Sequence, residues 1–260
     1  MKKFFFCFAV LSMMTIFACK NDNENHVAEY TTVHDTFCDT INTTPPLSLT
    51  FNLPCKIVYF NADKPGKARL VVLLHGGVSD KGYHSLLGKQ SHLDYVRNDE
   101  IICDYLKKSG KKSIFLAPIC HKAELDHCVK WHNCANDVKR MIDDLVNAGL
   151  VDESQIYLTG GSDGGVGTWE LAKRFPNLFA AIMPMSCGLS YELKVPVYWH
   201  STKSEGDFTE RANSLNSKGA NIHYRYHGDV GHGIDCNRID KALLDELFSN
   251  RIVIEYEKND

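Results

Sequence analysis

Apolar runs alternate along this chain with segments whose apolar residues recur at helical spacing. A short continuous apolar run is typical of a strand that is buried on both faces. The sequence predicts strands over residues 48–60, 69–74, 113–118, 156–159, 179–186, 195–200 and 222–226. It predicts helices over residues 93–108, 136–148, 165–175, 207–218 and 237–248. Strands that alternate with helices in this way indicate an α/β fold, with a mostly parallel central sheet and helices on both faces.

Four residues suited to chemistry come directly after predicted strands. They are Gly76, Ser162, Glu205 and His232. In a parallel sheet of this kind, ligands bind at the carboxyl ends of the strands. We therefore expect these four residues to meet at one edge of the sheet.

The turn around Ser162 carries the most specific pattern. A β-rich run ends at Gly160 and Gly161, a serine follows, and a helical stretch begins near Gly165. A nucleophile elbow has the pattern Gly-x-Ser-x-Gly between a strand and a helix, and it exposes the serine hydroxyl above the sheet. Glycines are needed there because side chains would collide with the neighbouring strand or helix. The alternative is an ordinary strand-to-helix turn.

A serine hydroxyl needs a base to take its proton and donors to stabilise the oxyanion that forms. His232 lies in a glycine-rich loop after the last predicted strand, where such a base is expected, although a solvated loop histidine is the alternative. The expected donors are the backbone N–H of Asp163 and an N–H from the loop that starts at Gly76 and Gly77. Glycines in that loop would let the backbone approach a substrate closely.

Segments 72–77, 157–169, 179–182 and 229–232 together resemble the secreted α/β-hydrolase esterases. These include polyhydroxybutyrate depolymerase-like, feruloyl and acetyl-xylan esterase, and dienelactone-hydrolase-like proteins. The resemblance covers about residues 50–250. It implies an α/β-hydrolase fold, Ser162 as the nucleophile, His232 as the general base, and no metal or organic cofactor.

The acid of the expected Ser–acid–His order is where this chain departs from that family. The family usually has His-Gly-x-x-Asp after the relevant strand, whereas residues 200–207 read His-Ser-Thr-Lys-Ser-Glu-Gly-Asp. Matching on His200 places Ser204 at the acid position, and matching along the strand places Glu205 there. Strand residues slip less freely than loop residues, so we expect Glu205, with Asp207 as the alternative. Both could instead be exposed loop acids.

These residues predict a carboxylic ester hydrolase that acts on acyl groups of a carbohydrate or a similar small ester through an acyl-enzyme. Two alternatives stay open. A serine peptidase can have the same fold. A non-catalytic, glycan-binding lipoprotein is the other, because without an acid the triad would be degraded.

The N-terminus predicts export. Lys2 and Lys3 precede an apolar stretch to residue 18 that is too short to cross a membrane comfortably. Residues 16–19 read Ile-Phe-Ala-Cys, which resembles a bacterial lipobox, so we expect lipid on Cys19, although a plain secretory signal is the alternative. The predicted organisation is a signal peptide at 1–18, a polar tether at 19–47 and a hydrolase domain at 48–260. The protein would then be lipid-anchored in a bacterial envelope, on the periplasmic face or the outer surface.

Charge and cysteine content refine this picture. Removal of Lys2 and Lys3 takes the formal net charge from −3 to −5, which argues against nucleic acid as a partner. Eight cysteines remain after the signal and Cys19, and an even number in an exported protein predicts disulfides, although the sequence does not give their pairing. Residues 120–134 hold three cysteines and three histidines, but they lack the short paired spacings of structural zinc sites. From their position, Trp131 or a nearby histidine is expected to help form the substrate pocket.

Overall fold

The computed structural model describes residues 33–34, 53, 55–77, 97–120, 131–228, 231–232 and 238–253 of the 260. The predicted signal peptide and Cys19 lie outside the described residues, as does the predicted tether except for residues 33–34. Those two residues form a short strand, β1 (Val33–His34), which pairs in parallel with the next strand. The predicted tether is therefore not entirely separate from the sheet, because the edge of a sheet offers free backbone groups for pairing.

Eight strands form one sheet in the order β1-β2-β4-β3-β5-β6-β7-β8. After β1 they are β2 (Cys55–Phe60), β3 (Ala68–Leu74), β4 (Ser113–Pro118), β5 (Val151–Gly161), β6 (Ala181–Met185), β7 (Val197–Ser201) and β8 (Ile222–Tyr226). All neighbours run parallel except β2 and β4, which are antiparallel. The carboxyl ends of β3 through β8 thus lie at one edge, as the sequence predicts.

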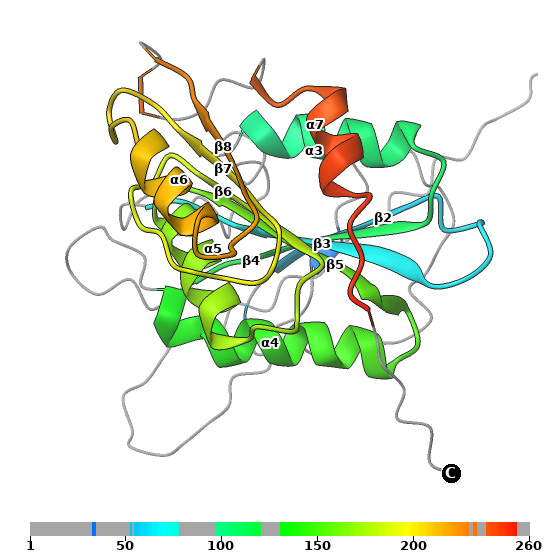
Figure 1. Ribbon diagram of the computed structural model, residues 1–260. Coiled ribbons are helices and arrows are strands. Elements are labelled where there is room, and N and C mark those ends of the chain that lie inside the picture. The colour runs from blue at the N-terminus through cyan, green and yellow to red at the C-terminus, as the bar shows by residue number, and fades with distance from the viewer. Residues whose placement is uncertain are drawn as a thin grey trace, which may run out of the picture.

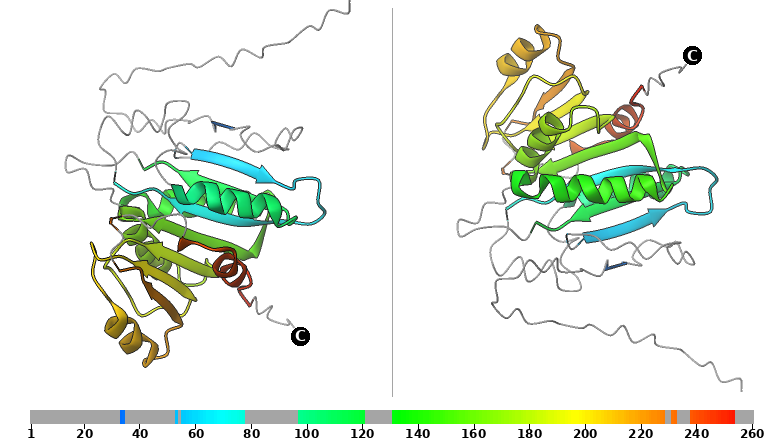
Figure 2. Two further views of the ribbon diagram at one scale, coloured as in Figure 1. Left: turned by 90° about the horizontal axis from the view of Figure 1, so that it is seen from above. Right: turned by 90° about the horizontal axis from the view of Figure 1, so that it is seen from below.

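Helices cover both faces of the sheet (Figures 1 and 2). They are α3 (Arg97–Lys108), α4 (Trp131–Asn147), α5 (Asp163–Arg174), α6 (Thr209–Asn216) and α7 (Lys241–Leu247). Side chains of the central strand β3 pack into two hydrophobic cores, one on each face of the sheet. Leu70 and Val72 pack in the core beneath α4, α5 and α6, whereas Val71 and Leu73 pack in the core beneath α3 and α7. Because both faces are covered, every residue of β3 is buried, and this explains its continuous apolar run.

The start of α4 differs from the sequence prediction. The helix begins at Trp131, five residues before the predicted start at 136. Trp131, Cys134 and Ala135 continue the buried face that Val138 and Met141 carry further along. The first turn was missed because its histidine, asparagine and cysteine residues hide the apolar spacing that burial reveals.

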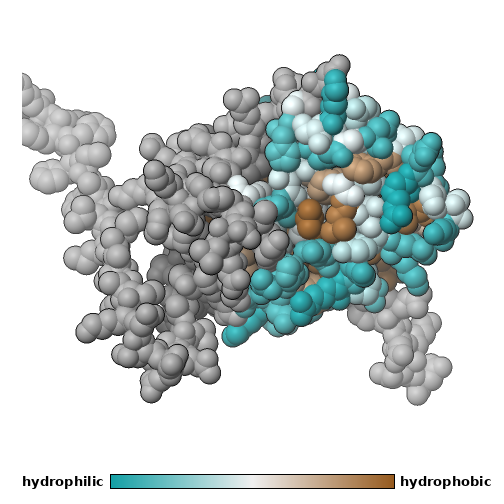
Figure 3. Space-filling model, turned by 90° about the vertical axis from the view of Figure 1, so that its left-hand side faces the viewer, coloured by the Kyte–Doolittle hydropathy of each residue, from teal (hydrophilic) through white to brown (hydrophobic). Residues whose placement is uncertain are grey.

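Most apolar side chains of the described residues lie inside the fold. Among the described residues, only Tyr226, 37% exposed, and Val253, 83% exposed, are exposed large hydrophobics. The coloured part of the surface in Figure 3 is accordingly mostly hydrophilic, with small hydrophobic areas within it. No helix in the part of the chain that the structure describes is long and apolar enough to span a membrane.

Candidate active site

Ser162 occupies a strained turn between β5 and α5. Its backbone has φ 58° and ψ −121°, a conformation that residues other than glycine rarely adopt. The turn is held in place because the Ser162 N–H donates to the Met185 carbonyl on β6 over 3.0 Å, and the Val166 N–H donates to the Ser162 carbonyl over 3.0 Å. Such strain persists only where the surrounding structure enforces it, and it is concentrated at functional sites.

The turn requires glycine at position 164. A Cβ on Gly164 would overlap the Leu74 carbonyl at the end of β3, whereas a Cβ on Gly161 would meet no heavy atom within 4 Å. The start of α5 therefore packs directly against the backbone of β3.

We expect Gly164→Ala to lower the free energy of unfolding by about 3 kcal/mol, because a backbone carbonyl cannot move aside as a flexible side chain can. Gly161→Ala is the matched control and should change it by less than about 1 kcal/mol. Urea denaturation of both variants measures the difference. Equal losses in the two variants would contradict the close approach of α5 to β3.

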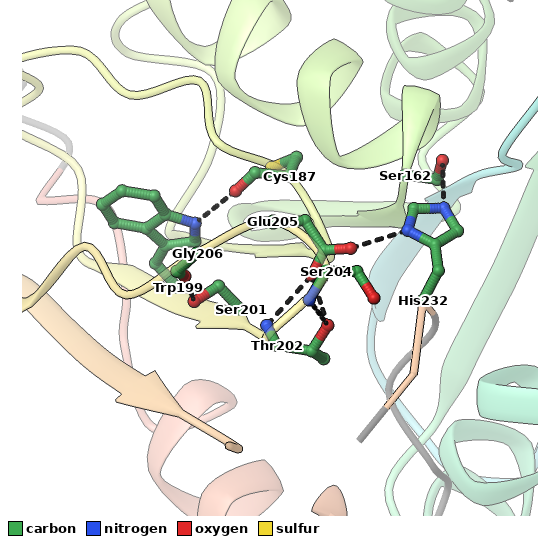
Figure 4. A network of polar contacts seen from close by, with 9 residues as sticks. All are labelled: Ser162, Cys187, Trp199, Ser201, Thr202, Ser204, Glu205, Gly206 and His232. Carbon is green, nitrogen blue, oxygen red and sulfur yellow. Dashed lines mark hydrogen bonds and ion pairs between the residues drawn. The ribbon is translucent and has the colours of Figure 1, made fainter. Parts of the chain in front are cut away.

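His232 connects the serine to an acid. Its Nε2 lies 2.9 Å from Ser162 Oγ, and its Nδ1 lies 2.6 Å from Glu205 Oε1 (Figure 4). The carboxylate can only accept, so Nδ1 carries the proton and Nε2 is left to accept from the serine hydroxyl. The His232 side chain is 59% exposed, whereas that of Glu205 is 8% exposed. The structure therefore brings the three predicted residues into one relay with the tautomer that a general base requires.

Glu205 is held by the turn that follows β7. Its Oε2 accepts from the Thr202 N–H over 2.9 Å and from Thr202 Oγ1 over 2.6 Å, which leaves Oε1 for His232. Burial works to raise the pKa of Glu205, but the hydrogen bonds from Thr202 and His232 outweigh burial and hold that pKa below its usual value. The carboxylate is therefore charged at neutral pH and fixed in direction. Sequence reasoning did not find Thr202 as its anchor.

The alternative acid, Asp207, lies in a different arrangement. Its Oδ1 accepts from the Thr209 N–H over 2.9 Å and from Thr209 Oγ1 over 2.6 Å, at the start of α6. Tyr224 donates to the same oxygen over 3.4 Å. Asp207 thus accepts hydrogen bonds at the start of α6. The alignment along the strand, which places Glu205 at the acid position, is the one in which the acid contacts His232.

A pair of histidines links the segment after β7, which carries Glu205, to the segment after β8, which leads to His232. The sequence analysis did not predict this pair. His200 Nδ1 lies 2.8 Å from His227 Nε2, and the two rings stack. Burial, and then His227 and Arg225, lower the pKa of His200 to about 3. Burial also lowers the pKa of His227, so both rings are neutral near pH 7 and one can accept from the other. The signal available in the sequence was a histidine at the end of each of two adjacent strands.

Backbone bonds reinforce this connection. The His227 N–H donates to the Ser201 carbonyl over 2.9 Å, and the Lys203 N–H donates to the Gly228 carbonyl over 2.9 Å. The segment that carries Glu205 and the segment that leads to His232 are thereby fastened side by side.

The predicted oxyanion residues lie beside the serine. Gly76 follows β3, and a Cβ on it would lie 3.4 Å from Ser162 Cβ. Gly77 is the next residue, and Asp163, the residue after Ser162, begins α5. The turn after β3 and the start of α5 therefore both lie next to Ser162.

Trp131 is a core residue, which corrects its expected place in the substrate pocket. It is fully buried, and its Nε1 donates to the His75 carbonyl over 3.0 Å. It carries an apolar ring whose one polar atom is satisfied internally, so burial is favourable. The five described cysteines are all buried, and Cys38, Cys128 and Cys236 lie outside the described residues.

Solved structures with similar folds include esterases. The chain aligns with a thermostable esterase at a TM-score of 0.54 and 20% identity, covering 80% of this chain and 61% of that one. It aligns with Est1E from Butyrivibrio proteoclasticus with bound ferulic acid at a TM-score of 0.55 and 13% identity, covering 76% of this chain and 96% of that one. The chain has the α/β-hydrolase fold. The fold expected from the sequence is thereby confirmed.

Two sequence similarities cover parts of this chain. The model of the prolyl oligopeptidase family matches residues 130–232, a segment that contains Ser162, Glu205 and His232. Acetylxylan esterase A of Emericella nidulans is 36% identical over 77 residues, which are 28% of this chain and 25% of that protein. The chain thus spans only part of the length of the relative and of the thermostable esterase.

Proposed function

We propose that this protein is a serine hydrolase of carboxylic esters. The observation that carries the proposal is the pair of hydrogen bonds that joins Ser162, His232 and Glu205. A serine with a base in contact, and that base oriented by an acid, is the arrangement needed for covalent catalysis through an acyl-enzyme. The esterases among the similar proteins support ester rather than other substrates.

Each side chain would have one task. Ser162 Oγ attacks the ester carbonyl while His232 Nε2 takes its proton, and Glu205 stabilises the imidazolium that forms. Backbone N–H groups of Asp163 and of the Gly76–Gly77 turn hold the oxyanion. His232 then returns the proton to the leaving alcohol. Finally, it activates a water molecule that releases the acid.

The proposed substrate class is an acyl group on a carbohydrate or a small ester. Its support comes from two similar proteins, one named as an acetylxylan esterase and one that holds ferulic acid. Both are associated with acids of modest size, so short acyl and aromatic acyl esters are the first substrates to test.

A serine peptidase is the second candidate, because the prolyl oligopeptidase family model matches the segment that holds all three relay residues. The non-catalytic alternative rested on the absence of a clear acid. The 2.6 Å contact between Glu205 and His232 removes that reason.

We expect the purified protein to hydrolyse p-nitrophenyl acetate and to react covalently with a fluorophosphonate at Ser162, since the relay makes this hydroxyl nucleophilic. Product release measured at 405 nm, with peptide mass mapping of the label, tests both outcomes. Activity on peptide amides without activity on esters would favour the peptidase. If the protein shows no turnover of the ester and no labelling of Ser162, the proposal is overturned.

A further inference from the structure

Two buried cysteines meet beneath the oxyanion side of the site. Cys120, just after β4, and Cys134, in the first turn of α4, are both 0% exposed. Their Sγ atoms lie 2.6 Å apart. Non-bonded heavy atoms touch at roughly 3.5–4.0 Å, whereas a disulfide bond is about 2.05 Å long. The two sulfurs are therefore closer than separate thiols pack.

The same two residues support the turn that carries the oxyanion donors. The Cys120 N–H donates to His75 Nε2 over 3.1 Å, and His75 Nδ1 lies 2.7 Å from the Gly76 carbonyl. His75 Nε2 accepts, so Nδ1 holds the proton, and burial lowers the pKa of His75 to about 4, which keeps the ring neutral. One end of the cysteine pair is thus bonded to the residue that orients Gly76.

Helix α4 contacts the same histidine from the other side. Trp131, three residues before Cys134, donates to the His75 carbonyl, and the two rings pack edge to face at 5.0 Å. Trp131 also touches the elbow helix, because a Cβ on Gly167 would lie 2.5 Å from Trp131 Cβ. The segment after β4 and the start of α4 therefore both hold His75 in place through hydrogen bonds.

We propose that Cys120 and Cys134 form a disulfide bond in the oxidised protein, and that this bond fastens β4 to α4 around His75. It is a covalent link whose existence does not depend on the proposed hydrolase activity. The predicted export to an oxidising compartment is the setting in which such a bond persists. The pairing, which the sequence left open, is then decided by proximity in the fold.

Formation of the bond is an exchange with an external disulfide, such as that of a thiol–disulfide oxidoreductase. One cysteine thiolate attacks the external disulfide and forms a mixed disulfide, and the second thiolate displaces the remaining external sulfur. The two cysteines lose two electrons and two protons, and the oxidant leaves as a dithiol. Because both sulfurs are fully buried in the fold, the exchange takes place before Cys120 has packed against α4.

Mass mapping of the unreduced full-length protein tests the pairing. Denaturation with iodoacetamide caps every free thiol, and trypsin then cuts after Lys122, Lys130 and Lys139. This places Cys120, Cys128 and Cys134 in three different peptides, 113–122, 123–130 and 131–139. We expect peptides 113–122 and 131–139 to be linked and to separate on reduction. Alkylation of both Cys120 and Cys134, or a link from Cys128 to either of them, would overturn the proposal.

Thermal unfolding provides a second measurement. Cys120→Ser and Cys134→Ser should each lower the Tm by about 5–10 °C, the loss expected for a disulfide that closes a short loop. The double variant should lower it no further, because either single change already removes the bond. Additive losses would indicate two independent buried thiols and would contradict the link.

Discussion

Ser162→Ala is expected to lower kcat for p-nitrophenyl acetate by about 10⁶-fold, the scale on which loss of a nucleophile acts in a serine relay. The hydroxyl is the atom that His232 Nε2 contacts at 2.9 Å, and alanine offers nothing in its place. Without this oxygen no acyl-enzyme can form. The turn itself should persist, because its geometry, with φ 58° at residue 162, is set by the backbone and by Gly164. Stopped-assay kinetics with active-site titration measure the loss.

A control serine separates chemistry from folding. Ser204 lies beside Glu205 in the same turn (Figure 4), and it was the acid position in the alternative register. Its backbone N–H, not its side chain, contacts Thr202. Ser204→Ala should keep kcat within about threefold of the wild-type value. Comparable losses in the two variants, or full activity of Ser162→Ala, would remove Ser162 from the mechanism.

Glu205→Gln is expected to lower kcat by about 10⁴-fold while leaving KM nearly unchanged. The amide retains the shape of the side chain but not its charge, so the His232 imidazolium loses its partner, and the amide can present an N–H to Nδ1 and favour the wrong tautomer. Asp207→Asn is the matched control, because Asp207 bonds Thr209 at the start of α6. We expect its kcat to change by less than about threefold. The reverse ranking of the two variants would assign the acid to Asp207.

The pH dependence should follow from the lowered pKa of Glu205. A carboxylate whose pKa is depressed by folding contributes stability at a pH above its unfolded value, and this is lost as the pH falls through the folded pKa. The relay should therefore stay charged at Glu205 when the pH falls through the usual range for glutamate. Protonation of Glu205 should disrupt these contacts only at a lower pH. The free energy of unfolding, measured as a function of pH for the wild type and for Glu205→Gln, tests this, because only the wild type should lose the contribution of Glu205 as the pH falls.

Local pattern determined the framework of this protein. The apolar runs of β3 and β4 indicated strands buried on both faces, and the two cores on either side of the sheet explain why no polar alternation was present. Glycines around Ser162 indicated the elbow because the conformation there is a property of a few consecutive residues. The position of His232 after the last strand followed from the order of the elements.

Contacts between segments far apart in the chain could be decided only by the tertiary structure. Glu205 and Asp207 are two residues apart and chemically alike, and only the turn anchored by Thr202 aims one of them at His232. Burial of Trp131 likewise depends on His75, 56 positions away. The sequence by itself therefore determined the elements, the elbow and the order of nucleophile, acid and base, because these arise from local spacing. The choice of acid, the support of the Gly76 turn and the meeting of Cys120 with Cys134 were decided by the tertiary structure, because each depends on the direction of a side chain across the fold.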